Sequence, residues 1–121
     1  MRVELLFWAG CPSHGKALRE LQDVLRESGH DPEAVIVREV KTDDDAASEG
    51  FVGSPTIRID GADVQPLADE PTGLTCRIYH RRDGRISPTP DPADLREAVL
   101  AATAAAAAPR GERPRAAGPS R

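Results

Sequence analysis

The chain has 121 residues, and its 16 Lys and Arg residues against 20 Asp and Glu residues give a formal net charge of −4 at pH 7. This length predicts a single domain with one core. The mild negative charge, without a basic stripe, argues against a nucleic-acid partner. The longest apolar run is a stretch of alanines too short to cross a bilayer, and no signal-peptide pattern opens the sequence. We therefore expect a cytoplasmic protein that binds neither nucleic acid nor a membrane.

Cysteine usage narrows the chemistry further. The chain contains two cysteines, Cys11 and Cys76. Two cysteines exclude a disulfide-rich scaffold, and in a reducing compartment such a pair is more often reactive, metal-binding or structural than a permanent bridge. We expect no cofactor and no resident metal ion.

The first predicted elements enclose one of these cysteines. Val3 to Trp8 is a short, apolar-rich run, typical of a strand buried on both sides. Apolar residues then recur at helical spacing from Ala17 to Leu25, which predicts a helix that ends at Ser28-Gly29. This helix is expected to start at or just after Cys11, with Pro12 at its first position. The cysteine thus lies between a strand and a helix.

The middle of the chain continues the alternation. Ala34 to Val40 predicts a second strand, and Asp43 to Glu49 a short helix capped by Thr42 or Asp43. Two strands joined through a helix form a parallel pair.

The rest of the chain predicts two more strands and a helix. Thr56 to Ile59 reads as a third strand closed by a turn at Asp60-Gly61. Cys76 to Tyr79 reads as a fourth, followed by a turn at Asp83-Gly84. Pro92 to Ala108 predicts a final helix capped by the preceding aspartate. The predicted order is βαβαββα, and the polar sequence beyond Pro109 predicts a disordered tail.

Two short motifs carry a family resemblance. Cys11-Pro12-Ser13-His14 is similar to the Cys-Pro-x-Cys motif of glutaredoxins, and Ser54-Pro55-Thr56 followed by Ile59-Asp60-Gly61 is similar to their cis-proline segment. The chain thus resembles the thioredoxin superfamily. More narrowly, WAGCPSH, GFVGSPTIRIDG and GLTCRIY resemble small bacterial proteins that are often labelled thioredoxin family or alkylmercury lyase. The resemblance implies a thioredoxin-like α/β fold over residues 1–106, with a mixed four-stranded sheet flanked by helices and a tail at 107–121.

The position of Cys11 favours a reactive thiol independently of the family. Unpaired N–H groups and the positive end of the dipole at a helix start favour the thiolate, which lowers the pKa of such a thiol below the free value of about 8.5. His14, three residues on, is close enough for its ring to approach the sulfur and either stabilise the thiolate or accept the thiol proton.

His14 also replaces the cysteine that would resolve a mixed disulfide within the motif. Three routes remain: resolution by an external thiol, a disulfide with Cys76, or a site that binds without redox turnover. The resemblance further implies that Ser54 before a cis Pro55 pairs through its backbone with a bound peptide or thiol. Pro12, Ser13, Ser54, Pro55 and Thr56 are accordingly the predicted substrate-binding residues.

Cys76 has two interpretations. Its apolar neighbours favour a core cysteine on a strand. Alternatively, the loop from Ala62 to Gly73 folds back and brings Cys76 within reach of Cys11, which requires Cα atoms within about 7 Å. Two sulfurs held together would also bind a soft metal.

The leading hypothesis is a thiol-redox protein of the thiol-disulfide oxidoreductase type. It would act on a small thiol or on a protein thiol or disulfide through Cys11, His14 and Cys76. An alkylmercury lyase or soft-metal protein and a non-enzymatic interaction module are the alternatives. The glutathione-binding turn of glutaredoxins is absent after Gly61. Arginines around residues 77–85 are interpreted as a solvated hairpin in preference to an anion site.

Overall fold

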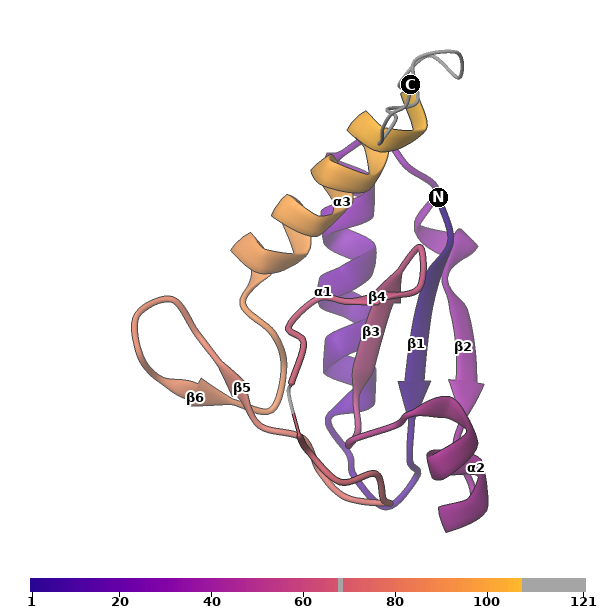
Figure 1. Cartoon of the computed structure of the whole chain (residues 1–121). Coiled ribbons are helices and arrows are strands. Elements are labelled where there is room, and N and C mark those ends of the chain that lie inside the picture. The colour runs from indigo at the N-terminus through magenta and orange to yellow at the C-terminus, as the bar shows by residue number, and fades with distance from the viewer. Residues whose placement is uncertain (68, 108–121) are drawn as a thin grey trace, which may run out of the picture.

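A four-stranded mixed sheet with helices against both faces forms the body of the protein (Figure 1). The structure is a computed structural model that describes residues 1–67 and 69–107. Its elements, in chain order, are β1 (Val3–Phe7), α1 (His14–Glu27), a short 3₁₀ turn (Pro32–Ala34), β2 (Ile36–Glu39), α2 (Asp43–Glu49), β3 (Thr56–Ile59), β4 (Ala62–Asp63), β5 (Tyr79–His80), β6 (Ile86–Ser87) and α3 (Pro92–Ala107).

The sheet has the strand order β2-β1-β3-β4. Leu5 in β1 lies opposite Val37 of the parallel β2 and Ile57 of the antiparallel β3. The parallel pairing of β1 with β2 confirms the prediction from the intervening helix. A tight turn at Asp60-Gly61, with φ values of 53° and 83°, folds β4 back antiparallel to β3. Both residues adopt the left-handed conformation that such a turn requires.

Two apolar clusters fill the space on either side of the sheet. One face of β1 and β3 packs against α1 and α3, which lie side by side in Figure 1. The other face packs against α2 through a smaller cluster: Leu6, Val40, Ala46 and Phe51. Because β1 contributes to both clusters, its residues Val3 to Leu6 are buried, as the apolar run predicted. Burial of one leucine of this kind stabilises the fold by about 1.5–3 kcal/mol.

The predicted helix caps and the predicted hairpin turn are present in the structure. The hydroxyl of Thr42 accepts a hydrogen bond from the backbone N–H of Asp45 at 3.0 Å and so caps α2. At the start of α3, the Asp91 carboxylate accepts one from the N–H of Ala93 at 2.9 Å. The predicted turn at Asp83-Gly84 connects β5 to β6.

Two strand predictions were wrong. The fourth strand of the sheet is β4, at Ala62–Asp63, where the sequence predicted a loop. The predicted strand Cys76–Tyr79 is reduced to Tyr79–His80, and this segment pairs with β6 in a separate two-stranded sheet. The tight turn after β3 decides the difference, because it returns the chain to the free edge of β3 at once.

The helix boundaries differ slightly from the predicted ones. α1 begins at His14, so Pro12 lies before the helix and Ser13 is its N-cap residue. Cys11 stays outside the helix because its N–H closes a turn on the carbonyl of Trp8 at 3.0 Å. The last described helical residue is Ala107; the rest of the predicted tail, 108–121, lies outside the described residues. No helix in the described part is long and apolar enough to span a membrane.

Candidate redox site

Cys11 and Cys76 form a disulfide in the structure. Their Cα atoms lie 5.5 Å apart although 65 positions separate them in the sequence. Such a distance is usual for a disulfide. The interpretation in which Cys76 reaches Cys11 required Cα atoms within about 7 Å, and the structure meets that requirement. Cys76 is also exposed, so the interpretation of this residue as a core cysteine was wrong.

The loop before β3 brings the two cysteines together. The Ser54–Pro55 peptide bond is cis, as the resemblance predicted. Ser54 is buried, and its side-chain hydroxyl accepts a hydrogen bond from the N–H of Trp8 at 3.0 Å. This contact fixes the chain just before Cys11. The loop of the cis-proline and the loop of the first cysteine are thus joined directly.

The same serine also holds the segment of the second cysteine. The N–H of Ser54 donates to the carbonyl of Thr75, and the carbonyl of Ser54 accepts from the N–H of Arg77, both at 2.8 Å. Ser54 and Cys76 therefore form an isolated parallel bridge. Both backbone groups that were predicted to pair with a substrate are occupied by the protein's own chain.

Gly53 allows this close approach. Its φ is 144°, and a Cβ atom added there would lie 2.9 Å from the Cβ and 3.1 Å from the Cα of Arg77. A Cβ contact of 2.9 Å essentially does not occur in proteins, and one of 3.1 Å to backbone is tighter than almost all that do. Glycine at this position is thus a requirement of the strand-like contact between residues 54 and 76.

The surroundings of the two sulfurs differ strongly. Cys11 is only 2% exposed, whereas Cys76 is exposed. The Cys11 sulfur lies 3.3 Å from the Ser13 hydroxyl oxygen and 3.6 Å from the Ser54 carbonyl oxygen. A hydroxyl next to a sulfur can donate to a thiolate, and a hydrogen bond to a charged acceptor is stronger than one to a neutral acceptor. Ser13 was predicted as a substrate-binding residue, and in the structure its hydroxyl lies against the Cys11 sulfur.

The ring of His14 is partly buried and contacts both Phe7 and the backbone of Cys11. Its ring stacks on Phe7, with centroids 4.3 Å apart, and its Nδ1–H donates to the carbonyl of Cys11 at 3.0 Å. That hydrogen bond assigns the proton to Nδ1 in the neutral ring. His14 therefore positions the backbone of Cys11, and its predicted catalytic role stays a prediction.

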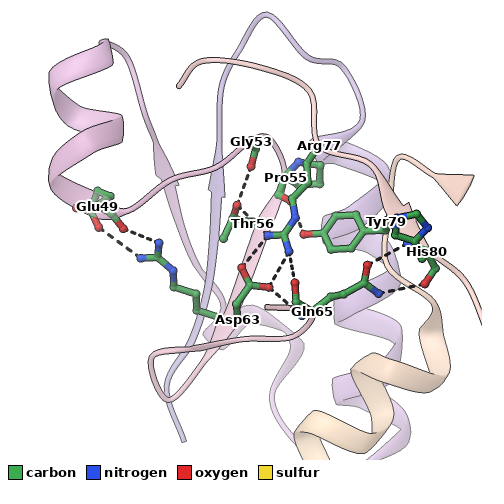
Figure 2. Close-up of polar contacts among 10 residues, drawn as sticks. Glu49, Gly53, Pro55, Thr56, Asp63, Gln65, Arg77, Tyr79 and His80 are labelled. Carbon is green, nitrogen blue, oxygen red and sulfur yellow. Dashed lines mark hydrogen bonds and ion pairs between the residues drawn. The ribbon is translucent and has the colours of Figure 1, made fainter. Parts of the chain in front are cut away.

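Arg77, the residue after Cys76, is held by Asp63 and Gln65, and Figure 2 shows these contacts. Its side chain is almost fully buried and forms two hydrogen bonds with the Asp63 carboxylate, at 2.7 and 3.0 Å. The guanidinium also donates to the carbonyl of Gln65 and lies over the ring of Tyr79, 4.4 Å from its centroid. Planar bidentate pairing of this kind suits arginine better than lysine. The residue after Cys76 is consequently fixed against β4.

Tyr79 completes this anchor. It is fully buried, and its hydroxyl donates to the carbonyl of Pro55 at 2.5 Å (Figure 2). Burial raises the pKa of Tyr79 well above its usual value, an effect that the nearby charge of Arg77 partly offsets. Pro55 and Thr56 thus support the site as buried structural residues, and Thr56 closes the loop by donating to the carbonyl of Gly53 at 2.7 Å.

An open groove of about 430 Å³ adjoins the exposed cysteine. It lies between the segment after α2 and the β5–β6 hairpin, and Cys11 does not line it. Besides Cys76, the groove is lined by four apolar and four polar or charged residues: Val52, Leu67, Ile78 and Ile86, and Glu70, Thr75, Arg77 and His80.

The arginines near the hairpin bind partners within the protein. Arg82 pairs with Asp94 at 2.8 Å, and Arg85 lies 3.6 Å from Asp83. Arg81 donates to the hydroxyls of Ser87 and Thr89. The exposed Arg82 and Arg85 agree with the interpretation of the segment as a solvated hairpin, whereas for Arg77 that interpretation was wrong, because this residue is buried against Asp63.

Sequence reasoning missed Asp63, Gln65 and Arg77 as supports of the site. The available signal was a charged residue, Arg77, inside an otherwise apolar run, because such a residue needs a buried partner.

No group of three or more His, Cys, Asp or Glu side chains within residues 1–67 and 69–107 is arranged to hold a metal ion. Comparisons of the chain with protein-family models, curated proteins and solved structures find no match.

Proposed function

We propose that the protein is a thioredoxin-like thiol-disulfide exchange protein in which Cys11 and Cys76 are oxidised and reduced as a pair. One observation carries the proposal: a disulfide joins the cysteine before α1 to an exposed cysteine beside the cis-proline loop. Cys76 then supplies the second sulfur that the Cys-Pro-Ser-His motif lacks. Of the routes left open by the sequence, this arrangement supports the two-cysteine route over resolution by an external thiol.

The exchange reaction balances without a cofactor. Two molecules of an external thiol reduce the disulfide: the first forms a mixed disulfide with one protein sulfur and releases the other as a thiolate. The second thiol attacks the mixed disulfide, forms the external disulfide and releases the second protein thiolate. Two electrons pass to the protein, and the two protons of the external thiols end on its two cysteines or in solvent. Oxidation of the reduced protein by an external disulfide follows the same steps in reverse.

The Ser13 hydroxyl is suited to assist this reaction. It lies 3.3 Å from the Cys11 sulfur, where it can donate to a thiolate in the reduced protein. Stabilising a thiolate makes the sulfur a better leaving group when the disulfide is attacked.

A soft-metal function is the second candidate. The two sulfurs lie within bonding distance of each other, so in the reduced protein they are suited to bind a thiophilic ion such as Hg²⁺ with two ligands. Cleavage of a carbon–mercury bond needs, in addition, a proton donor to the departing carbon.

Catalysed reduction of a disulfide substrate tests the proposal. Wild-type protein, Cys11→Ser, Cys76→Ser and the double variant are compared for the rate at which dithiothreitol reduces a small disulfide, the oxidised dimer of N-acetylcysteine amide. We expect wild-type protein to accelerate the reaction and the double variant to leave it at the uncatalysed rate. Turnover by Cys11→Ser or Cys76→Ser equal to that of wild type would contradict the two-cysteine route.

Mercury chemistry is measured on the same four proteins after reduction. Release of the hydrocarbon from an alkylmercury salt by wild type, lost in both single variants, would favour the second candidate. Inactivity in both assays would instead favour a non-enzymatic interaction module.

A further inference from the structure

We infer that the two cysteines have different roles: Cys76 exchanges with the external thiol, Cys11 is the internal resolving sulfur, and the external thiol is a small molecule with an apolar substituent. It enters through the groove beside Cys76. This inference rests on the proposed thiol-disulfide exchange and specifies its direction and substrate class. It departs from the expectation that the cysteine at the helix start is the one that meets the substrate.

Accessibility decides which sulfur is attacked. An attacking thiolate must reach the sulfur along the line of the bond that breaks, so access governs the choice between the two. Cys11 is 2% exposed and is enclosed by the turn to Trp8 and by Ser54. Cys76 is exposed and lines the groove of about 430 Å³, whereas Cys11 does not. Attack from the groove therefore leads to Cys76.

The surroundings of the sulfur that leaves also favour attack on Cys76. When Cys76 is attacked, Cys11 departs as the thiolate, and it lies 3.3 Å from the Ser13 hydroxyl just before the N-terminus of α1. A donor hydroxyl and the positive end of a helix dipole both stabilise negative charge. The opposite attack would release the charge on Cys76.

The step balances as follows. An external thiolate bonds to the Cys76 sulfur, the Cys11–Cys76 bond breaks, and its electron pair remains on Cys11. A second external thiol then bonds to the first, which releases the Cys76 thiolate. One external disulfide forms, and one protein disulfide is reduced. In the oxidising direction, the Cys76 thiolate attacks an external disulfide, and Cys11 resolves the mixed disulfide.

The occupied backbone of Ser54 favours a small thiol over an extended polypeptide. An extended peptide gains affinity by pairing with free backbone groups. Here the Ser54 N–H and carbonyl are both bonded to the protein's own residues Thr75 and Arg77, at 2.8 Å. The close contact at Gly53 leaves no space for another strand between the two segments. A small molecule needs neither group.

The walls of the groove favour an apolar substituent on that thiol. Ile78 and Ile86 are 55% and 66% exposed, and they line the groove together with Val52 and Leu67. A ligand that covers such side chains removes apolar surface from water. A volume of about 430 Å³ lies in the range of small-molecule sites.

Mapping the first mixed disulfide tests the assignment of roles. Oxidised full-length protein is mixed with N-acetylcysteine amide at a substoichiometric ratio and quenched with acid at early times. Free thiols are alkylated, and the modified peptides are identified by mass spectrometry. We expect the adduct on Cys76 and the alkylated thiol on Cys11, in at least about ten-fold excess over the reverse. Equal adducts, or more adduct on Cys11, would overturn the inference while leaving the exchange function intact.

Failure of the proposed function gives a different result. If N-acetylcysteine amide does not reduce the protein disulfide at any concentration, no adduct forms on either cysteine, and the result contradicts both the proposed function and this inference. The two failures are therefore distinguishable in one experiment.

A matched pair of thiols tests the substituent. N-acetylcysteine benzylamide has the same reacting group as N-acetylcysteine amide and adds one apolar ring. We expect it to reduce wild-type protein about five-fold faster, because partial burial of the ring lowers the free energy of the encounter. Ile86→Ser should abolish this preference, and Leu100→Ser should keep it, because Leu100 is similarly exposed, at 61%, but lies on α3 outside the groove.

Three results would overturn the substrate class. These are equal rates for the two thiols, loss of the preference in both serine variants, or faster reduction by a ten-residue cysteine peptide than by the benzylamide. The two substituted residues are exposed, so both variants are expected to fold, and far-UV circular dichroism checks this.

Discussion

Reduction of the Cys11–Cys76 disulfide is expected to lower the free energy of unfolding by about 4 kcal/mol. The bond closes a loop with a sequence separation of 65. In the chain-entropy model, a loop of that size restricts the unfolded chain by about 14 cal/mol/K, which corresponds to about 4 kcal/mol at 25 °C. The Arg77–Asp63 pair does not depend on the disulfide, so the folded state of the reduced protein should persist.

Urea unfolding of the oxidised and reduced protein measures this difference, followed by far-UV circular dichroism and by the fluorescence of Trp8, the single tryptophan. At a slope of about 2 kcal/mol/M, the midpoint should fall by about 2 M on reduction. Cys76→Ser is the matched control: its midpoint should lie near that of the reduced wild type and should not respond to reductant. A wild-type difference below about 1 kcal/mol, or an equal response to reductant in Cys76→Ser, would show that the disulfide does not stabilise the fold by restricting the unfolded chain.

Three further predictions address the supports of the site. Burial raises the pKa of Tyr79, the single tyrosine, so the contribution of this residue to stability should be constant below pH 10 and lost above it. Tyrosinate absorbance should therefore rise only as the far-UV circular dichroism signal is lost. Tyrosinate in the folded protein near pH 10 would contradict this prediction. Gly53→Ala should destabilise the protein by about 1–3 kcal/mol more than Gly61→Ala. Both glycines have positive φ, but only at Gly53 would the added Cβ collide with Arg77. Equal urea midpoints for the two variants would argue against that contact. In the Cys76→Ser background, Ser13→Ala should raise the pH midpoint of the Cys11 thiolate absorbance at 240 nm by about one unit. An unchanged midpoint would exclude a hydrogen bond from the Ser13 hydroxyl to the Cys11 thiolate.

Local features of the fold were predictable because their causes lie within a few residues. The cap of α2 by Thr42 and the turn at Asp60-Gly61 each depend on one or two side chains. β1 was predictable because its apolar run is buried on both faces. Such elements would form in the same places for many different arrangements of the rest of the chain.

Two features of the fold were not predictable, β4 because it is very short and the segment from Cys76 because it depends on a distant contact. β4 has two residues, and its alternation is too short to detect; it exists because the preceding turn brings it to β3. The segment from Cys76 has the composition of a strand, but Arg77 is buried there against Asp63, 14 positions earlier. That pairing fixes the segment to β4 through a side chain, and the strand that follows, Tyr79–His80, pairs with β6 in a separate sheet.

The site itself was predictable in part. The sequence placed Cys11 before a helix and Pro55 before a strand, and both positions follow from local patterns. It left Cys76 undecided, because the position of this residue depends on the path of residues 62–75. The backbone contacts of Ser54 with that returning chain were beyond sequence reasoning, since they require two distant segments to meet.

The central claim is that Cys11 and Cys76 form one exchangeable pair, and a redox titration tests it most directly. Purified protein is equilibrated in buffers of graded dithiothreitol and oxidised dithiothreitol, quenched with acid, alkylated and weighed by mass spectrometry. We expect only unlabelled and doubly labelled protein to be populated, in a single two-electron transition that disappears in Cys76→Ser. Singly labelled wild-type protein through the transition, or two free thiols under all conditions, would contradict it.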